Sequence, residues 1–143
     1  MSEPTQWHWS CDLAVPAQSG AADDLIDHLL DQMRLLAWPE KDMFNVQLAF
    51  SEAMTNAIMH GNRSDPQKKV YLQCGVQEDE VRISIRDEGS GFNPDELPDP
   101  RHPDNILTPT GRGILLIRHI MSRVEFLSCG NGLIMTKYRT ITQ

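Results

Sequence analysis

Apolar side chains recur at helical spacing in two stretches of the N-terminal half of the chain. Residues 21–38 repeat apolar positions every three or four residues, which predicts an amphipathic helix that Pro39 stops. A second such pattern covers residues 41–60 and predicts a longer helix that ends at Gly61. Because apolar side chains surround most of this second helix, we expect it to be buried.

Alternating apolar and polar residues predict five strands. The first is a single segment near the N-terminus, and the other four form two hairpins. These segments are 6–15, 69–77, 81–87, 124–128 and 133–139.

A loop rich in proline, residues 93–110, separates the two hairpins and precedes a further predicted helix over 113–122. Helices combined with hairpins predict the α+β class. We expect a two-layer sandwich in which a mixed, mostly antiparallel sheet carries its helices on one face, within a single domain over residues 1–143.

Composition and charge narrow the possible functions. The 143 residues are 40% hydrophobic and 23% charged, as in an ordinary soluble domain. The net charge of −7 argues against non-specific nucleic-acid binding and against adhesion to anionic membranes. An anionic ligand would therefore need Mg²⁺, backbone N–H groups or a well-placed arginine. Three widely spaced cysteines, with neither a secretory signal nor a membrane span, fit free thiols in the cytoplasm.

The long predicted helix carries a polar stripe. Glu52, Asn56 and His60 lie four residues apart, and residues with this spacing share a helix face. The small side chains of Ala53 and Ala57 lie beside the stripe and leave room for a ligand. A buried carboxylate and a buried amide need partners, because an unpaired polar group costs roughly 1–3 kcal/mol. A ligand is one source of partners; a structural polar cluster or a solvated face is the alternative.

Asp87 follows the strand over 81–87 on that strand's apolar face, where a carboxylate requires hydrogen-bond donors. The amino group of a purine is one candidate donor. Gly89 and Gly91 come directly afterwards and permit a tight turn with a close approach of the backbone to a ligand. In the alternative interpretation Asp87 caps its own turn, as Asp-x-Gly sequences often do.

Gly111, Arg112 and Gly113 lie between the proline-rich loop and the helix over 113–122. Glycines at the start of a helix leave N–H groups accessible, and the helix dipole favours an anion there. Arg112 would add a charge-assisted contact to phosphate. An ordinary loop-to-helix turn explains the same residues equally well.

The order of these motifs is more specific than any one of them. Glu-x-x-x-Asn on a helix, Asp-x-Gly-x-Gly after a strand and Gly-x-Gly after a long loop resemble one ATP-binding superfamily. Its members include DNA gyrase, the heat-shock chaperone of ninety kilodaltons, mismatch-repair ATPases and sensor histidine kinases. Within it, residues 51–57 and 135–138 are most similar to the anti-sigma-factor serine kinases of bacterial stress and sporulation circuits.

The resemblance implies a Mg-ATP site between the long helix and the sheet. In it, Asn56 binds Mg²⁺ and Glu52 is the general base, while Asp87 and Thr136 contact the adenine. His60 either supports the phosphate contacts or only ends the helix. The further nucleotide-binding residues that the resemblance implies are Gly89, Gly91, Gly111, Arg112 and Gly113, with residues 93–112 as a lid.

The resemblance also implies an anti-sigma regulatory factor with serine/threonine protein kinase activity. Such a factor phosphorylates an anti-sigma-factor antagonist in a partner-switching circuit, with a sigma factor as a further candidate partner, and acts as a homodimer. One alternative is a binding module that holds nucleotide and sequesters a regulator without phosphoryl transfer. An ATPase within a larger assembly is a third hypothesis, which the lack of a transducer domain disfavours.

Overall fold

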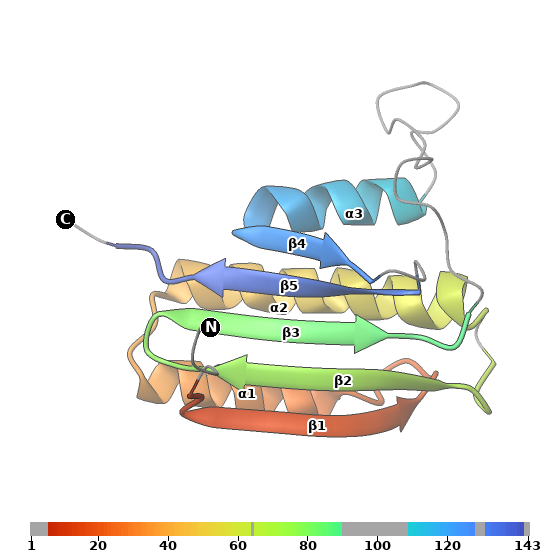
Figure 1. Ribbon diagram of the computed structural model, residues 1–143, viewed down its shortest axis with the longest axis horizontal. Helices are drawn as coiled ribbons and strands as arrows, with labels where there is room; N and C mark the ends of the chain where they lie inside the picture. Colours follow the sequence, from red (N-terminus) through yellow and green to blue (C-terminus); the bar gives the residue numbers. More distant parts are fainter. Residues whose placement is uncertain (1–5, 64, 90–108, 128–130, 142–143) are drawn as a thin grey trace, which may run out of the picture.

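An antiparallel sheet forms one layer of the fold (Figure 1). The computed structural model describes residues 6–63, 65–89, 109–127 and 131–141. Within them the strand order is β1-β2-β3-β5-β4, and all four pairings are antiparallel, so the sheet is not mixed. The strands are β1 (Trp9–Pro16), β2 (Lys69–Val76), β3 (Glu80–Arg86), β4 (Arg123–Phe126) and β5 (Gly132–Tyr138).

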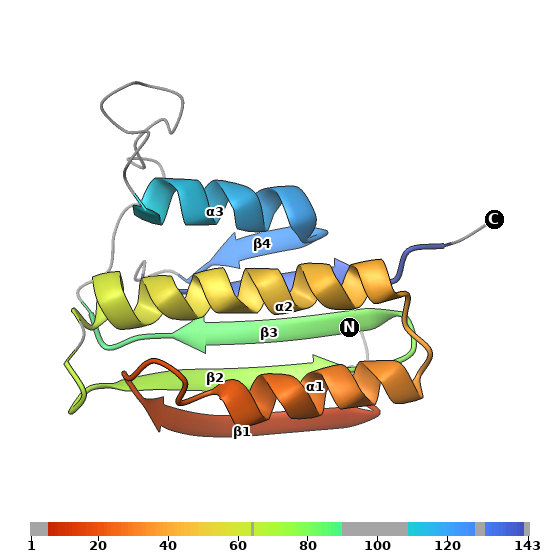
Figure 2. The same cartoon turned by 180° about the vertical axis from the view of Figure 1, so that it is seen from behind.

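The helices form the second layer. They lie behind the sheet in Figure 1 and in front of it in Figure 2. The predicted two-layer α+β sandwich with helices on one face is therefore confirmed. The helical segments are α1 (Asp23–Leu35), α2 (Glu40–Thr55), the π-helical turn η1 (Asn56–Gly61) and α3 (Pro109–Ile120).

Strand β3 shows how alternation builds the core. Val81, Ile83 and Ile85 are at most 2% exposed. Arg82 and Arg86 alternate with them and are exposed. This parity directs the apolar face of the sheet toward the helices. Fully buried side chains from both layers meet there, among them Leu29, Met33, Val46, Leu72, Ile117 and Met135.

The outer face of the sheet is held by contacts between cations and aromatic rings. The Arg82 guanidinium lies 5.3 Å from the centre of the Trp7 ring, and the Arg86 guanidinium lies 4.4 Å from the Tyr71 ring. Trp7 covers Gly75 so closely that a Cβ on that glycine would overlap the indole. The long stems and rings cover this face while the charges stay in water.

Helix α1 ends earlier than the predicted range of 21–38. Ala37 has a φ of 58°, a left-handed conformation that stops the helix after Leu35. The Arg139 side chain then donates hydrogen bonds to the carbonyls of Leu36 and Ala37, at 2.9 and 2.6 Å. A residue distant in sequence therefore satisfies the carbonyls that the helix end leaves unpaired.

Two helix boundaries near the predicted motifs also differ from expectation. The long helix is α-helical only to Thr55 and continues as η1. Helix α3 begins at Pro109, so Gly111 and Gly113 lie inside the helix rather than before it. Proline suits the first helical position, because its missing N–H has no partner there in any helix. The part of the predicted lid over 93–108 lies outside the described residues.

The sheet and helices bring three segments to one end of the molecule. Figure 2 shows the end of η1, the end of β3 and the start of α3 at the same side. None of the described helices is both long enough and apolar enough to cross a membrane.

The buried face of β3 generates a stability prediction. We expect Ile83→Ala to lower the free energy of unfolding by about 2–5 kcal/mol, because it leaves a cavity at a fully buried position. Urea unfolding measures the change. Leu115→Ala, at a side chain that is 52% exposed, is the matched control and should change stability by no more than about 0.5 kcal/mol. Equal losses in the two variants would contradict this assignment of the core.

Candidate functional site

Two polar side chains of the long helix lie beneath the start of α3. Glu52 is in the last turn of α2 and Asn56 is the first residue of η1, and both are half-buried. A Cβ built on Gly113 would lie 3.2 Å from Glu52 Oε2 and 3.2 Å from Asn56 Nδ2. The carboxylate, the amide and the α3 backbone therefore form one polar cluster, as the sequence predicts for Glu52, Asn56 and Gly113.

The amide of Asn56 is the one buried side-chain group in this cluster without a partner. Its Nδ2 atom is inaccessible to water and forms no hydrogen bond to the described residues. An orphaned polar atom of this kind costs roughly 1–3 kcal/mol. A half-turn of the amide would present Oδ1 at the same place, and amide oxygens are suitable ligands for Mg²⁺. The amide thus fits a metal or a polar ligand.

The π-helical turn continues the polar stripe to the end of the helix. Within it, the Asn62 N–H donates to the carbonyl of Ala57 at 2.9 Å, a bond across five residues. Such turns are rare and frequently mark functional sites. His60 lies in the same turn and its side chain is exposed.

Asp87 forms the second part of the candidate site. It extends the row of buried side chains at every second position of β3, and it is 8% exposed. Its Oδ1 accepts a hydrogen bond of 2.7 Å from the Gly89 N–H. The other oxygen, Oδ2, lies where a Cβ on Gly61 would be, and accepts no hydrogen bond from the described residues. The self-capped turn and the ligand site are therefore compatible, because each uses a different oxygen.

Burial affects the charge of Asp87. Desolvation raises the pKa of its carboxyl above the ordinary value of 3.8, against the opposing effects of the Gly89 N–H and the positive charge of Lys68. The folded protein consequently binds this proton more tightly than the unfolded chain does. A hydrogen-bond donor on a ligand would relieve part of this cost.

Glycines allow the two turns around Asp87 to approach each other. A Cβ on Gly89 would overlap the carbonyl oxygen of Gly61, and one on Gly61 would overlap the Asp87 carboxylate. Side chains at these two positions would push the turn after β3 away from η1. The close approach that Gly89 permits in the structure is to the backbone of Gly61, and its predicted approach to a ligand stays a prediction. Gly91 lies outside the described residues.

Two asparagines that the sequence analysis did not assign complete this region. Asn131 accepts a hydrogen bond of 2.8 Å from the Asp87 N–H through its carbonyl, and its Nδ2 donates to the Asp87 carbonyl at 3.1 Å. Asn62 is fully buried and contacts the same turn from the helix side. Asn131 lies in a Gly-Asn-Gly turn, which predicts a hairpin but not its neighbour in space.

The structure corrects the placement of Thr136 beside the adenine-binding carboxylate. Thr136 pairs with Arg82 in the β3–β5 register, whereas Asp87 is bonded to Asn131. Arg82 and Asp87 are five positions apart, which separates Thr136 from Asp87 by about 16 Å along the strand. Thr136 also lies on the outer face of the sheet, as its partner Arg82 does, so it cannot contact the same ligand atom as Asp87.

The remaining predicted residues lie at the start of α3. Gly111 and Arg112 are in its first turn, where N–H groups have no partner within the helix. The next residue of the helix, Gly113, is in contact range of Glu52 and Asn56. In the parts of the chain that the structure describes, no three His, Cys, Asp or Glu side chains gather as metal ligands. A metal at Asn56 would therefore need ligands from a bound substrate.

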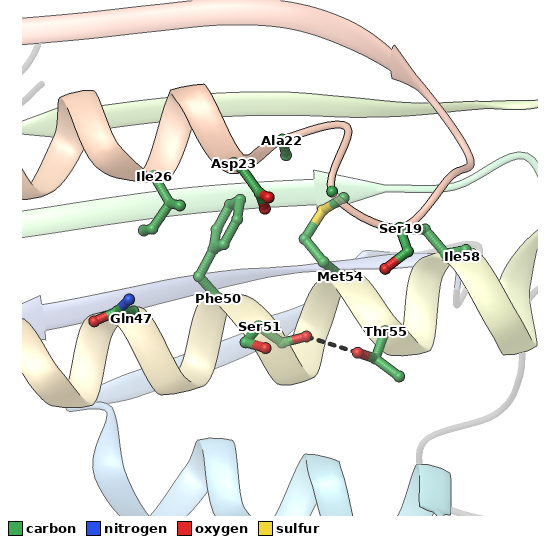
Figure 3. A pocket seen from close by; sticks show the side chains of 11 residues that line it. Ser19, Ala22, Asp23, Ile26, Gln47, Phe50, Ser51, Met54, Thr55 and Ile58 are labelled. Atoms are coloured by element: carbon green, nitrogen blue, oxygen red, sulfur yellow. Dashed lines mark hydrogen bonds between the residues drawn. The ribbon is translucent and has the colours of Figure 1, made fainter.

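A separate cavity of about 220 Å³ lies on the other side of α2, against the start of α1 (Figure 3). Figure 3 shows the Asp23 carboxylate pointing toward α2, with Phe50 to one side of it and Met54 to the other. Among the described residues that line it, Asp23 is the only one with a titratable side chain. This cavity therefore lacks the paired polar groups found around Glu52, and we do not assign the chemistry to it.

Comparisons with known proteins identify the family of the chain. Residues 15–137 match the family described as the histidine kinase-like ATPase domain. The chain is 38% identical over 101 residues to the anti-sigma F factor of Oceanobacillus iheyensis. This alignment covers 67% of this chain and 69% of that protein. It is 35% identical over 103 residues to the anti-sigma F factor of Bacillus cytotoxicus, with 68% and 70% covered.

A solved structure shows the same fold. It contains the RsbU and RsbW domains of a Mycobacterium tuberculosis protein, and its TM-score to this chain is 0.60 at 17% identity. The match covers 98% of this chain but only 34% of that longer one. At this identity the likeness concerns the fold alone.

The buried carboxylate generates a pH prediction. Because the pKa of Asp87 is raised in the folded state, wild-type stability should fall as the pH rises through that pKa. Asp87→Asn removes the titration and keeps an oxygen for the Gly89 N–H. We expect this variant to be more stable than the wild type at pH 7, with the difference shrinking as the pH falls toward 4. Thermal unfolding across this range measures it, and a variant less stable than the wild type at pH 7 would contradict the assignment.

Proposed function

Because the chain belongs to the histidine kinase-like ATPase domain family, we propose that it is an ATP-binding anti-sigma regulator that phosphorylates a serine of an antagonist protein. One observation carries the proposal. Asn56 presents a buried amide nitrogen that has no hydrogen-bond partner among the residues that the structure describes, directly beside the Glu52 carboxylate and the start of α3. A phosphate-bound metal and a hydroxyl group are ligands that would satisfy this pair.

The base of the nucleotide would lie at the Asp87 end. The Oδ2 atom of Asp87 accepts the hydrogen bond from the exocyclic amino group of adenine in this proposal. Its other oxygen is already bound to the Gly89 N–H, which holds the carboxylate in place. Gly61 and Gly89 have no side chains, so the Asp87 carboxylate and the turn after β3 can pack against the end of η1.

The phosphates would lie between Asn56 and the start of α3. The free N–H groups of the first α3 turn, together with Arg112, supply donors and positive charge in a protein whose net charge is −7. Asn56 would hold Mg²⁺ through Oδ1. When bound, Mg²⁺ would supply charge neutralisation for the phosphate oxygens.

Glu52 would be the general base for transfer. Its carboxylate accepts the proton of the substrate serine hydroxyl as the Oγ–phosphorus bond forms and the bond from the γ-phosphorus to ADP breaks. Its position next to Asn56 would hold the hydroxyl in line with the phosphate, and positioning supplies much of the rate enhancement in phosphoryl transfer.

The partners follow from the relatives that the chain matches. Those relatives are named anti-sigma F factors, so we propose a sigma factor as one partner and a small antagonist protein as the phosphorylated one. We further propose that the protein acts as a homodimer in the cytoplasm. His60, exposed at the end of η1, would lie at the edge of the phosphate region.

A transfer assay tests the function. The protein is incubated with Mg-[γ-³²P]ATP and each small antagonist-type protein encoded in the source genome. Labelled serine on one of them would support the kinase and identify its substrate. ATP binding without label on any protein would favour the alternative of a nucleotide-dependent binding module.

The position of Glu52 generates a prediction about rate. Glu52→Ala should lower phosphoryl transfer by about 10²–10⁴-fold while ATP binding stays within about twofold, because the carboxylate acts on the hydroxyl and not on the nucleotide. Single-turnover transfer and calorimetric titration measure the two effects. Ser51→Ala, at the exposed neighbouring residue of α2, is the matched control and should transfer normally. Wild-type transfer by Glu52→Ala would exclude this mechanism.

The unpartnered amide generates a prediction about the metal. Asn56→Ala should weaken ATP binding in Mg²⁺ by about 10- to 100-fold, because a ligand of the metal is lost. With EDTA in place of Mg²⁺, wild type and variant should bind ATP almost equally. Titrations under both conditions measure this difference, and a loss of the same size in EDTA would show that Asn56 does not act through the metal.

A further inference from the structure

Asn62 is the most completely bonded buried side chain near the candidate site. It is 0% exposed. Its Oδ1 accepts a hydrogen bond of 2.8 Å from the Glu88 N–H, and its Nδ2 donates one of 2.9 Å to the carbonyl of Lys69. Its own N–H closes the π-helical turn, because it donates to the Ala57 carbonyl. One side chain therefore joins the long helix, the start of β2 and the turn after β3.

The bonds around Asn62 form a closed triangle. The Lys69 N–H donates to the Glu88 carboxylate, which links the two partners of Asn62 to each other. Each corner of the triangle comes from a different segment, so none of the three can shift without breaking a bond to another. The two bonds of the Asn62 side chain are partly buried, whereas the Lys69–Glu88 bond is exposed. A hydrogen bond is stronger where water has less access to it, so the two Asn62 bonds are the main hold on the turn.

The triangle bears directly on Asp87. Glu88, held by Asn62, is the next residue in the chain, and Gly89, which binds Asp87 Oδ1, is the one after it. Gly61, against which the Asp87 carboxylate packs, directly precedes Asn62. Asn131 holds the backbone of Asp87 from the opposite side. Asn62 adds a side-chain hydrogen bond between the turn that carries Asp87 and the helix that carries Asn56, beside the packing of the Asp87 carboxylate on Gly61.

We propose that Asn62 is a positioning residue that aims the Asp87 carboxylate and thereby sets the preference of the site for a purine bearing a 6-amino group. This inference rests on the proposed function, because it assumes that Asp87 recognises the adenine ring of the nucleotide. Asn62 itself would not touch the nucleotide. Loss of its side chain frees the turn after β3, so that Asp87 Oδ2 no longer meets the amino group at hydrogen-bonding geometry.

The experiment compares ATP with purine riboside triphosphate, which is ATP without its 6-amino group. Calorimetric titrations in Mg²⁺ give the affinity ratio of the two ligands for wild type, Asn62→Ala and the milder Asn62→Ser. We expect the wild type to prefer ATP by about 10- to 100-fold, the value of a hydrogen bond to a charged group. Asn62→Ala should reduce this preference to less than about threefold, while its affinity for purine riboside triphosphate changes by less than about threefold.

A matched control separates positioning from general loss of stability. Asp42 lies in the first turn of α2, far from Asp87, and is 1% exposed. It accepts two hydrogen bonds from Thr140, at 2.8 and 2.6 Å. Asp42→Ala also breaks a buried polar cluster, yet it should keep the full preference for ATP. Thermal unfolding confirms that each variant is folded at the titration temperature.

The outcomes are distinguishable. A folded Asn62→Ala that keeps the wild-type preference would overturn the inference and leave the role of Asp87 intact. If the wild-type protein binds both ligands equally, Asp87 does not recognise the 6-amino group of adenine. That result would overturn this inference as well. If both Asn62 variants fail to fold while Asp42→Ala folds, Asn62 is a folding residue and the inference is also wrong.

Discussion

The contact between the Asp87 carboxylate and the backbone of Gly61 joins the two layers of the fold at their functional end. It requires a strand that ends with a carboxylate on its buried face and a helix that ends with a residue lacking a side chain. Because the contact leaves no room for a Cβ, the distance between the turn after β3 and the end of η1 is closely defined. The Asn62 triangle and the Asn131 bonds then hold this geometry from two sides.

The candidate site carries costs that the rest of the molecule offsets. Asp87 is desolvated, and the Asn56 amide lacks a partner among the described residues. Groups in this condition lower the stability of a protein and are retained where a ligand or a reaction uses them. The offsetting contribution comes from the face between sheet and helices, where side chains such as Ile83 and Leu29 are fully buried. The apolar core and the candidate site therefore occupy different parts of the same two layers.

Much of the fold could be predicted from the sequence because periodicity is a local property. The alternation of Val81, Ile83 and Ile85 with arginine and serine placed β3 and put Asp87 on the correct face. The four-residue spacing of Glu52 and Asn56 likewise placed both groups on one face, where Gly113 meets them. The motif order was sufficient for the family, which the match over residues 15–137 confirms.

What could not be predicted depends on pairing between distant segments. The resemblance of the last strand to that of the family predicts Thr136 beside the adenine, but the register against β3 places Asn131 beside Asp87. That register is decided by the hairpin turn and by the opposing strand, and neither is contained in the strand's own pattern. The π-helical turn and the bonds of Asn62 have the same origin, since the start of β2 and the turn after β3 supply their partners.

We propose that one continuous site runs from Asn56 to Asp87 on the α3 side of the long helix. A crystal structure with Mg²⁺ and a non-hydrolysable ATP analogue tests this most directly. We expect the metal at the oxygen of the Asn56 amide and the 6-amino group of the adenine at the Asp87 carboxylate. A nucleotide found elsewhere, for example in the cavity between α1 and α2 shown in Figure 3, would contradict it.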